Sequence, residues 1–519
     1  MAEVYHEYMI IGAGPAGLQL GYYLAKEGRD YLIIEAGPTP GTFFKTFPRH
    51  RTLISSNKVY TGFDDPGINL RWDWNSLLGD NDAMLFKQYS KRYFPPADDM
   101  VRYLSEFATY YDLNIEFEIK VINIARDNDF KLIDSLGNKY SCRVLVIATG
   151  FLKPYLPNIP GIELVDVYTE VSTCPEDFVN KKVLIIGKGN SAFETAENLI
   201  ETAAVIHLAS PNPLKMAWKT HFVGHLRATN NNILDTYQLK SQNVIIDASI
   251  DKIERRDGKF IVSFRYTHAQ GECEDVSYDC VIACTGFRFD DSIFGDDCRP
   301  MLAINDRFPA QTSEWEACNV KDLYFAGTLM QMRDYRHTTS GFIHGFRYNI
   351  LALHRIFEQK YHLQEWPSRQ ITATPEDIAG IVIKQINKTS ALWQQFGFLC
   401  DLILIADQNC TARYYEMLPV DYVHDSVFGR HAHYYLITLE FGIISGDPFN
   451  IERSPDIAQA DQSTFLHPVI RHFNGSTLLA EQHLLEDLDA NWSKQTVHVQ
   501  PLIDFFRREL GQQSAIGSL

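Results

Sequence analysis

Two glycine-rich turns are the segments of this chain whose residue types and spacing could do chemistry. Each follows a short apolar run, and their members are Gly12, Ala13, Gly14, Pro15, Ala16 and Gly17 in the first and Gly187, Gly189, Asn190, Ser191 and Ala192 in the second. The glycines permit a tight turn, close approach of a pyrophosphate and packing of the following helix on the strand. The helix N-terminus then offers free N–H groups to the phosphates. We therefore expect two dinucleotide sites, for FAD at the first turn and for NADPH at the second.

The residues that end the second strand of each unit distinguish the two sites. Glu35 ends the first unit's strand and is placed to accept hydrogen bonds from an adenosine ribose. The corresponding strand of the second unit ends at Ser210 without a carboxylate, which favours NADPH because no acid repels its 2′-phosphate. Lys215, Lys219 and Arg227 follow and could supply positive charge, although a solvated loop face is an equally good interpretation.

Composition sets the limits on partners and domain count. The 519 residues favour two or three domains. A net charge of −17 argues against nucleic acid and anionic membranes as partners. Met1–Glu7 lacks a basic leader segment, so we expect a cytoplasmic protein. The first cysteine is Cys142 and none forms a Cys-x-x-Cys pair, which disfavours disulfide reduction by an internal dithiol.

The order of expected elements repeats after each glycine turn, as strand, helix, strand, a β-meander or hairpin, and a returning strand. The sequence predicts an α/β fold with tandem Rossmann-like dinucleotide-binding domains in three-layer β/β/α form. We expect a discontinuous FAD domain over 1–155 and 283–360, an NADPH domain over 156–282, and a C-terminal α+β accessory domain over 361–519.

Several segments carry a resemblance to a known group. The two turns, Gly41–Phe44, Ala148–Gly150 and Pro175–Phe178 are similar to segments of the flavin-containing monooxygenases. More closely, the chain resembles the FAD-dependent oxidoreductase domain-containing protein 2 family. The segments that carry this likeness are Pro48–Lys58, Arg71–Leu78, Gly189–Asn198, Asp235–Lys240 and Phe465–Val469.

The resemblance implies further site residues. Asn57 and Lys58 are the expected catalytic residues beside the flavin ring, with a turn-closing role for Asn57 as the alternative. Phe44 and Gly150 lie in segments that resemble flavin-binding ones. Gly327 and Thr328 follow a buried strand where related flavin domains have Gly-Asp near the ribityl chain, and Thr328 can still donate a hydrogen bond.

Other residues are weaker candidates. A helix from Ser340 could direct its positive end at the flavin pyrimidine, and Arg333, Arg336 and His337 just before it could line a substrate entrance or be plain surface charge. For His431 and His433 we favour packing over metal binding, because no acid or cysteine lies at ligand spacing. We expect no metal.

The function implied by the resemblance is oxygen transfer. NADPH would reduce FAD, and a flavin C4a-hydroperoxide would pass one oxygen atom from molecular oxygen to a nitrogen or sulfur, less readily to a carbonyl carbon, of a small molecule. Tyr168 stands where the monooxygenase fingerprint has histidine. Two alternatives therefore stay open, an NADPH oxidase that releases hydrogen peroxide and a flavin-bearing protein-binding factor.

The C-terminal domain would cover the site or make a homodimer contact. The chain ends in Gly517-Ser518-Leu519, without the endoplasmic-reticulum retention tail of the animal members.

Overall fold

The first sheet carries the first glycine turn at the end of its central strand. The computed structural model describes residues 3–238, 243–406, 411–444, 446–447 and 449–516, so Gly517-Ser518-Leu519 lies outside the described residues. β1 (Val4–Ile11) pairs in parallel with β2 (Tyr31–Ile34) and β6 (Lys139–Ile147). The sheet order is β3-β2-β1-β6-β5-β4, and β18 (Leu323–Phe325) also pairs with β6. The remaining strands are β3 (Ile115–Glu116), β4 (Val121–Arg126) and β5 (Phe130–Asp134).

Alternation of side chains along β1 creates two cores. Tyr8 and Ile10 face the helices α1 (Pro15–Lys26), α4 (Ala97–Tyr110) and α8 (Ile343–His362). Met9 and Ile11 face the opposite core with residues of β4 and β5. Because the second half of β1 and all of β2 are buried on both faces, these segments are continuous apolar runs rather than alternating ones.

The second sheet repeats this plan around the second turn, in the order β13-β12-β11-β10-β9-β14-β8. β9 (Lys182–Ile186) leads into α5 (Asn190–Leu199), and β10 (Val205–Ser210) pairs with both β9 and β11. The other members are β8 (Asp166–Val167), β11 (Val244–Arg256), β12 (Lys259–Tyr266), β13 (Cys273–Tyr278) and β14 (Cys280–Ala283). The predicted tandem Rossmann-like fold is confirmed.

A short antiparallel pair connects the two dinucleotide units. β7 (Lys153–Pro154) pairs with β15 (Phe287–Arg288), and these are the segments by which the chain leaves the first unit and returns to it. The domain limits expected from the sequence fall near these strands and remain predictions.

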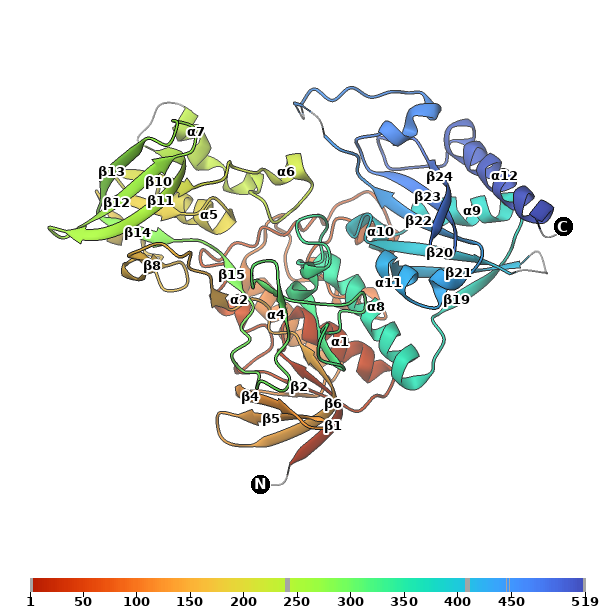
Figure 1. Ribbon diagram of the computed structural model, residues 1–519, viewed down its shortest axis with the longest axis horizontal. Coiled ribbons are helices and arrows are strands. Elements are labelled where there is room, and N and C mark those ends of the chain that lie inside the picture. Colours follow the sequence, from red (N-terminus) through yellow and green to blue (C-terminus); the bar gives the residue numbers. More distant parts are fainter. Residues whose placement is uncertain (1–2, 239–242, 407–410, 445, 448, 517–519) are drawn as a thin grey trace.

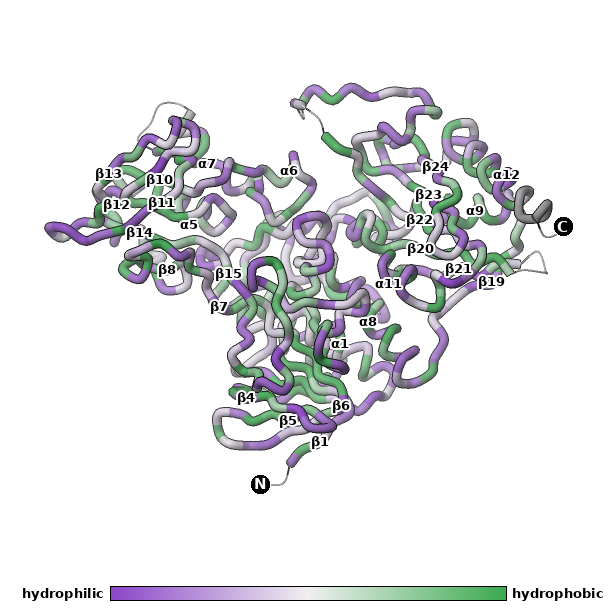
Figure 2. Tube along the Cα trace, viewed as in Figure 1, coloured by the Kyte–Doolittle hydropathy of each residue, from purple (hydrophilic) through white to green (hydrophobic). Residues whose placement is uncertain are grey.

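The C-terminal part is a six-stranded antiparallel sheet with helices on it, as Figure 1 shows. Its order is β19-β21-β20-β22-β23-β24, and α9 (Pro375–Ile386) and α12 (Gln500–Ile516) share its apolar core. The strands are β19 (Ser368–Thr372), β20 (Leu399–Ile405), β21 (Thr411–Pro419), β22 (Tyr434–Glu440), β23 (His467–Asn474) and β24 (Thr477–His483). In Figure 2 hydrophobic positions gather along the strands and hydrophilic ones on the outer loops.

Two sequence expectations differ in detail from the structure. β6 is one long strand from Lys139 that pairs with β1 along most of its length. On its other side the first half pairs with β5 and the second half with β18, so the meander and the returning strand are one continuous strand. The helix expected from Ser340 begins at Ile343, with Phe342 as its N-cap. Within the described part of the chain, no helix is long and apolar enough to cross a bilayer.

Candidate functional site

The first glycine turn has the shape of a phosphate cradle. Gly12 has φ +110°, and a Cβ there would lie 2.7 Å from the carbonyl oxygen of Ala148. A Cβ on Gly17 would lie 1.9 Å from the carbonyl oxygen of Gly12, so turn and helix are packed backbone to backbone. At Gly14, the N-cap of α1, a Cβ would meet no atom within 4 Å. The open space therefore lies directly beside the free N–H groups of the helix.

Glu35 holds the turn from the neighbouring strand. One carboxylate oxygen accepts from the Ala13 N–H at 2.8 Å and the other from the Gly37 N–H at 2.7 Å. Each oxygen can accept a second hydrogen bond. Glu35 thus fixes the backbone of the turn, and its contact with a ribose stays a prediction.

The second turn repeats this geometry. Gly187 has φ +130°, and a Cβ there would lie 2.3 Å from the carbonyl oxygen of Cys284, whereas one on Gly189 would meet nothing. Asn190 fastens the turn to a later loop, because its amide donates to the His225 carbonyl at 2.9 Å and accepts from the Arg227 N–H at 2.9 Å. Both turns leave open space where a diphosphate needs it.

One cavity of about 490 Å³ reaches from the first turn to the second. The predicted cofactor residues that line it are Gly14, Pro15, Ala16, Phe44, Gly150, Asn190, Ser191, Gly327 and Thr328. Gly327 has φ +76° and approaches Ala16 so closely that a Cβ would lie 2.6 Å from the Ala16 Cβ. The Thr328 hydroxyl beside it is buried without a hydrogen-bond partner. An orphaned hydroxyl next to an open cradle is what a bound FAD would satisfy, so these residues fit that cofactor.

The other predicted cofactor residues do not line the cavity. Gly12, Ala13, Gly17, Glu35, Gly187 and Gly189 lie outside the lining, and the contacts above place them in or beside the backbone of the two turns. Ser210, Lys215 and Lys219 also lie outside it. Both lysines are exposed, Lys215 on the loop after β10 and Lys219 on the short helix α6 (Ala217–Thr220). Their contacts with NADPH stay predictions.

Asn57 and Lys58 lie away from the cavity. The buried Asn57 amide donates to the carbonyls of Ser90 at 3.0 Å and Arg92 at 3.1 Å. Lys58 is exposed. Asn57 therefore joins its own loop to the segment that contains Ser90 and Arg92, and neither Asn57 nor Lys58 lines the cavity. The catalytic role of Asn57 and Lys58 stays a prediction.

Sequence reasoning missed a carboxylate beside the second site. Asp247 on β11 is paired in register with Ser210, and the Lys188 ammonium forms an ion pair with it. Lys188 Nζ also donates to the Ser210 carbonyl at 3.1 Å. The strand end that has no acid of its own thus has one on the neighbouring strand, neutralised by a lysine from the glycine turn.

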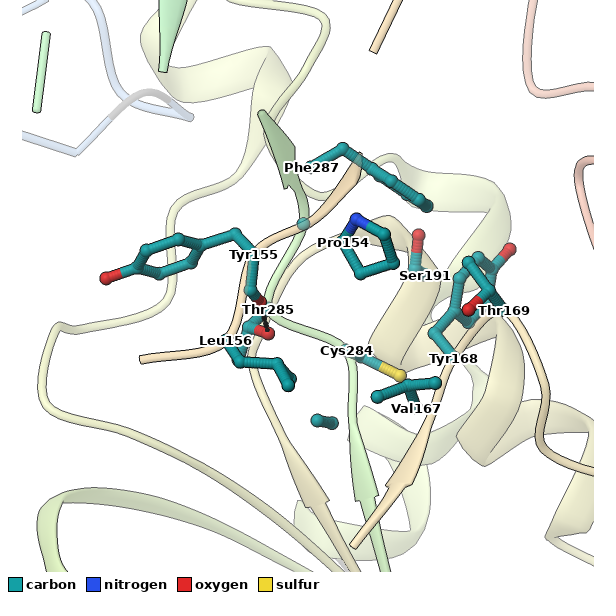
Figure 3. Close-up of a pocket in the computed structure, with 12 residues that line it drawn as sticks. Pro154, Tyr155, Leu156, Val167, Tyr168, Thr169, Ser191, Cys284, Thr285 and Phe287 are labelled. Carbon is teal, nitrogen blue, oxygen red and sulfur yellow. Dashed lines mark hydrogen bonds between the residues drawn. The ribbon is translucent and has the colours of Figure 1, made fainter. Parts of the chain in front are cut away.

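Tyr168 and Glu194 form a second pair that the sequence did not reveal. The Tyr168 hydroxyl donates to the Glu194 carboxylate, and both line the cavity. Burial raises the pKa of Glu194 to about 7, against the lowering effect of the Tyr168 hydrogen bond. Figure 3 shows Tyr168, with Ser191 and Phe287, around a small pocket next to Cys284. A carboxyl that titrates near neutrality can hold or release a proton at this wall of the cavity.

The remaining candidates have other surroundings. Arg333 pairs with Asp421 of the C-terminal part, and Arg336 and His337 are exposed, so none of the three lines the cavity. His433 lies 3.2 Å from His472. Among the described residues no group of three His, Cys, Asp or Glu side chains could hold a metal ion.

Comparison with known proteins identifies the class of protein to which the chain belongs. Residues 9–327 match the family model described as pyridine nucleotide-disulphide oxidoreductase. A flavin-containing monooxygenase from Stenotrophomonas maltophilia superposes with a TM-score of 0.52 at 19% identity, over 69% of this chain and 99% of that one. A bacillithiol disulfide reductase from Staphylococcus aureus gives 0.54 at 20% identity, again over 69% and 99%. These two solved structures share the fold. Fold, site and family model together define a flavin-dependent oxidoreductase.

Relatives of higher identity give the family. FAD-dependent oxidoreductase domain-containing protein 2 of Mus musculus is 37% identical over 558 residues, covering 96% of this chain and 83% of the relative. The protein of the same name in Danio rerio is 35% identical over 573 residues, covering 96% and 82%. The chain belongs to the FAD-dependent oxidoreductase domain-containing protein 2 family, as the sequence resemblance predicted.

Proposed function

We propose that this protein is an NADPH-dependent FAD monooxygenase that transfers one atom of molecular oxygen to a nitrogen or sulfur of a small molecule. The observation that supports it is the single cavity lined at one end by Gly14–Ala16 and at the other by Asn190 and Ser191. A hydride donor at the second turn and a flavin at the first would then meet in one shared space. FAD, when bound, supplies hydride acceptance and oxygen activation.

The chain's own residues bind, orient and exclude water. The N-terminal end of α1 receives the diphosphate, and the Thr328 hydroxyl offers a hydrogen bond near it. Aromatic side chains form much of the cavity wall, among them Phe44, Phe47, Phe151 and Phe287. A dry wall favours oxygen transfer over loss of peroxide to water. Burial favours a proton on the Glu194 carboxyl, which accepts a hydrogen bond from the Tyr168 hydroxyl.

The experiment begins with anaerobic reduction. Purified protein that carries flavin is mixed with NADPH and then with isotopically labelled oxygen, with and without tertiary amines and thioethers. We expect rapid bleaching of the flavin and one labelled oxygen atom in the amine or sulfide product. Bleaching followed by release of all reducing equivalents as hydrogen peroxide would instead indicate an oxidase, and absence of bleaching would indicate a flavin-bearing binding protein.

A further inference from the structure

His344 is a buried histidine whose two ring nitrogens have no hydrogen-bond partner. It is 2% exposed and lines the cavity at the first turn of α8. Its ring stacks on Trp74 with centroids 4.3 Å apart and an interplanar angle of 22°, and Phe342 stacks on it at 5.9 Å. Burying both ring nitrogens without hydrogen-bond partners destabilises the folded protein. Such groups are rare, because buried polar groups in proteins are almost always paired.

The charge state of His344 follows from its neighbours. Burial, and then the charges of Arg347 and Arg227, hold its pKa well below the ordinary value. The ring is therefore neutral, with one nitrogen that donates and one that accepts. A bound molecule with a polar group could satisfy either nitrogen.

Arg227 places a cation in the same corner. Its guanidinium lies over the Trp74 ring, 4.9 Å from the centroid, and the residue lines the cavity. Its pKa is lowered chiefly by burial. In the described parts of the chain no carboxylate lies within ion-pair distance of it, and it is the sole arginine or lysine among the described residues that line the cavity. A half-buried guanidinium without an anion is an anion site.

The rest of the cavity wall limits the kind of anion. Phenylalanine and aliphatic side chains form most of it, including Phe43, Leu53, Val223 and Phe346. We propose that Arg227, His344 and Trp74 form a subsite for a small organic carboxylate with an apolar body. The carboxylate would pair with the Arg227 guanidinium, a second polar atom would bond to His344, and the apolar body would lie against the phenylalanines. This inference rests on the proposed function, since the carboxylate is taken to be the molecule that the oxidoreductase acts on.

The phosphates of NADPH are also anions, and the Arg227 guanidinium can pair with them as it can with a carboxylate. The backbone N–H of Arg227 is bonded to Asn190 in the second glycine turn, and both residues line the same cavity. The test therefore needs arms with and without the coenzyme.

Calorimetric titration of the flavin-loaded protein with phenylacetate and with its neutral analogue phenylacetamide provides the test. We expect phenylacetate to bind at least about tenfold more tightly, the factor that one charge-assisted hydrogen bond supplies. Arg227→Met should remove this preference and Arg227→Lys should keep part of it. His344→Phe, which keeps the stack on Trp74, should weaken binding about threefold or more through loss of the ring nitrogens.

Arg102→Met is the matched control. Arg102 also lies over an aromatic ring, 5.5 Å from the Tyr89 centroid, but it is outside the cavity lining. Its removal should leave the Kd of phenylacetate unchanged. Thermal melting of each variant confirms that the fold is retained.

Repeating the titration at saturating NADP⁺ distinguishes a substrate carboxylate from a coenzyme phosphate as the anion that Arg227 binds. An unchanged preference for the carboxylate supports the substrate subsite. Loss of carboxylate binding under NADP⁺ would overturn it and assign Arg227 to the coenzyme. Equal affinity for acid and amide in the wild-type protein would overturn it outright. Failure of the proposed function is seen separately, as absence of flavin bleaching by NADPH, because the calorimetric readout does not require turnover.

Discussion

Gly14 is the residue at which the FAD assignment can be tested with the least disturbance to the fold. Its φ of −76° suits any residue, and an added Cβ meets no atom within 4 Å. Gly14→Ala should therefore leave the stability of flavin-free protein within about 0.5 kcal/mol of wild type. The methyl group would occupy the space beside the helix N-terminus, so retention of FAD should fall about tenfold or more. Flavin absorbance after dialysis measures this. Gly380→Ala on α9, where a Cβ is equally free, should retain FAD normally, and so would Gly14→Ala if the cradle were not the diphosphate site.

Glu194 makes stability depend on pH. Its folded-state pKa of about 7 lies above its ordinary value of 4.5, so stability is fully present below about pH 4.5 and is lost as pH rises through about 7. Glu194→Gln removes this titration. The unfolding free energy of the variant relative to wild type should therefore rise by about 1–3 kcal/mol between about pH 4 and pH 8. Urea denaturation of flavin-free protein at both pH values is the measurement.

Tyr168→Phe provides the opposite perturbation. The Tyr168 hydroxyl lowers the pKa of Glu194, so its loss should raise that pKa and make the decline of stability with pH steeper. A Glu194→Gln variant with the same pH dependence as wild type would show that the carboxyl is already ionised in the folded protein.

The residues that the sequence could and could not predict differ in how far their partners lie along the chain. The glycine turns and Glu35 were predictable because each acts within one strand-turn-helix-strand unit. Tyr168–Glu194 and Lys188–Asp247 join residues of different elements, and only the fold brings them together. Asn57 was assigned to catalysis from resemblance, whereas its amide is used by the carbonyls of Ser90 and Arg92.

At the scale of elements, the start of α8 depends on a glutamine from the C-terminal part. The fully buried Gln395 accepts from the Thr339 N–H at 3.2 Å and donates to Ser340 at 2.9 Å and to Asn349 at 2.7 Å. These contacts fix the turn before Gly341, which lines the cavity. The periodicity of α8 gave no sign of this partner, which is why its start was placed at Ser340 instead of Ile343.

Gln395→Met should therefore loosen both the fold and the cofactor site. The side chain keeps its length but leaves buried donors and acceptors unpaired, at a cost of about 2–4 kcal/mol. Flavin-free protein should melt at lower temperature, and the Kd for FAD should rise. Gln370→Met on the exposed edge strand β19 is the control and should change neither. An unchanged Kd for FAD in Gln395→Met would show that the turn before α8 does not support the flavin.

At the scale of the whole molecule, the C-terminal part touches both dinucleotide units. Arg333 pairs with Asp421 on the first unit's side, and His221 of the second unit stacks on Phe441 with centroids 4.1 Å apart. Figure 1 shows the second unit and the C-terminal sheet on either side of the first unit. The class of fold was predictable from the sequence, but the contacts between the C-terminal part and the two units depend on single side chains that no periodic pattern marks.

Phe441→Ala tests whether the C-terminal part holds the loop after β10. The Phe441 ring stacks on His221 and meets Phe396 edge to face, and such pairs contribute about 0.5–1.5 kcal/mol each. The loop's own backbone bonds include Ala217 N–H to the Leu226 carbonyl at 2.9 Å and the Leu226 N–H to the Lys215 carbonyl at 3.0 Å. If the stack limits opening of this loop, hydrogen exchange at these amides should accelerate by up to about tenfold in Phe441→Ala.

Phe465→Ala, on the same part of the chain but without a ring contact to the loop, should leave exchange unchanged. Because Arg227 follows directly in this loop, faster exchange should also be accompanied by weaker binding of phenylacetate. Equal exchange in wild type and Phe441→Ala would mean that the stack of Phe441 on His221 does not hold this loop.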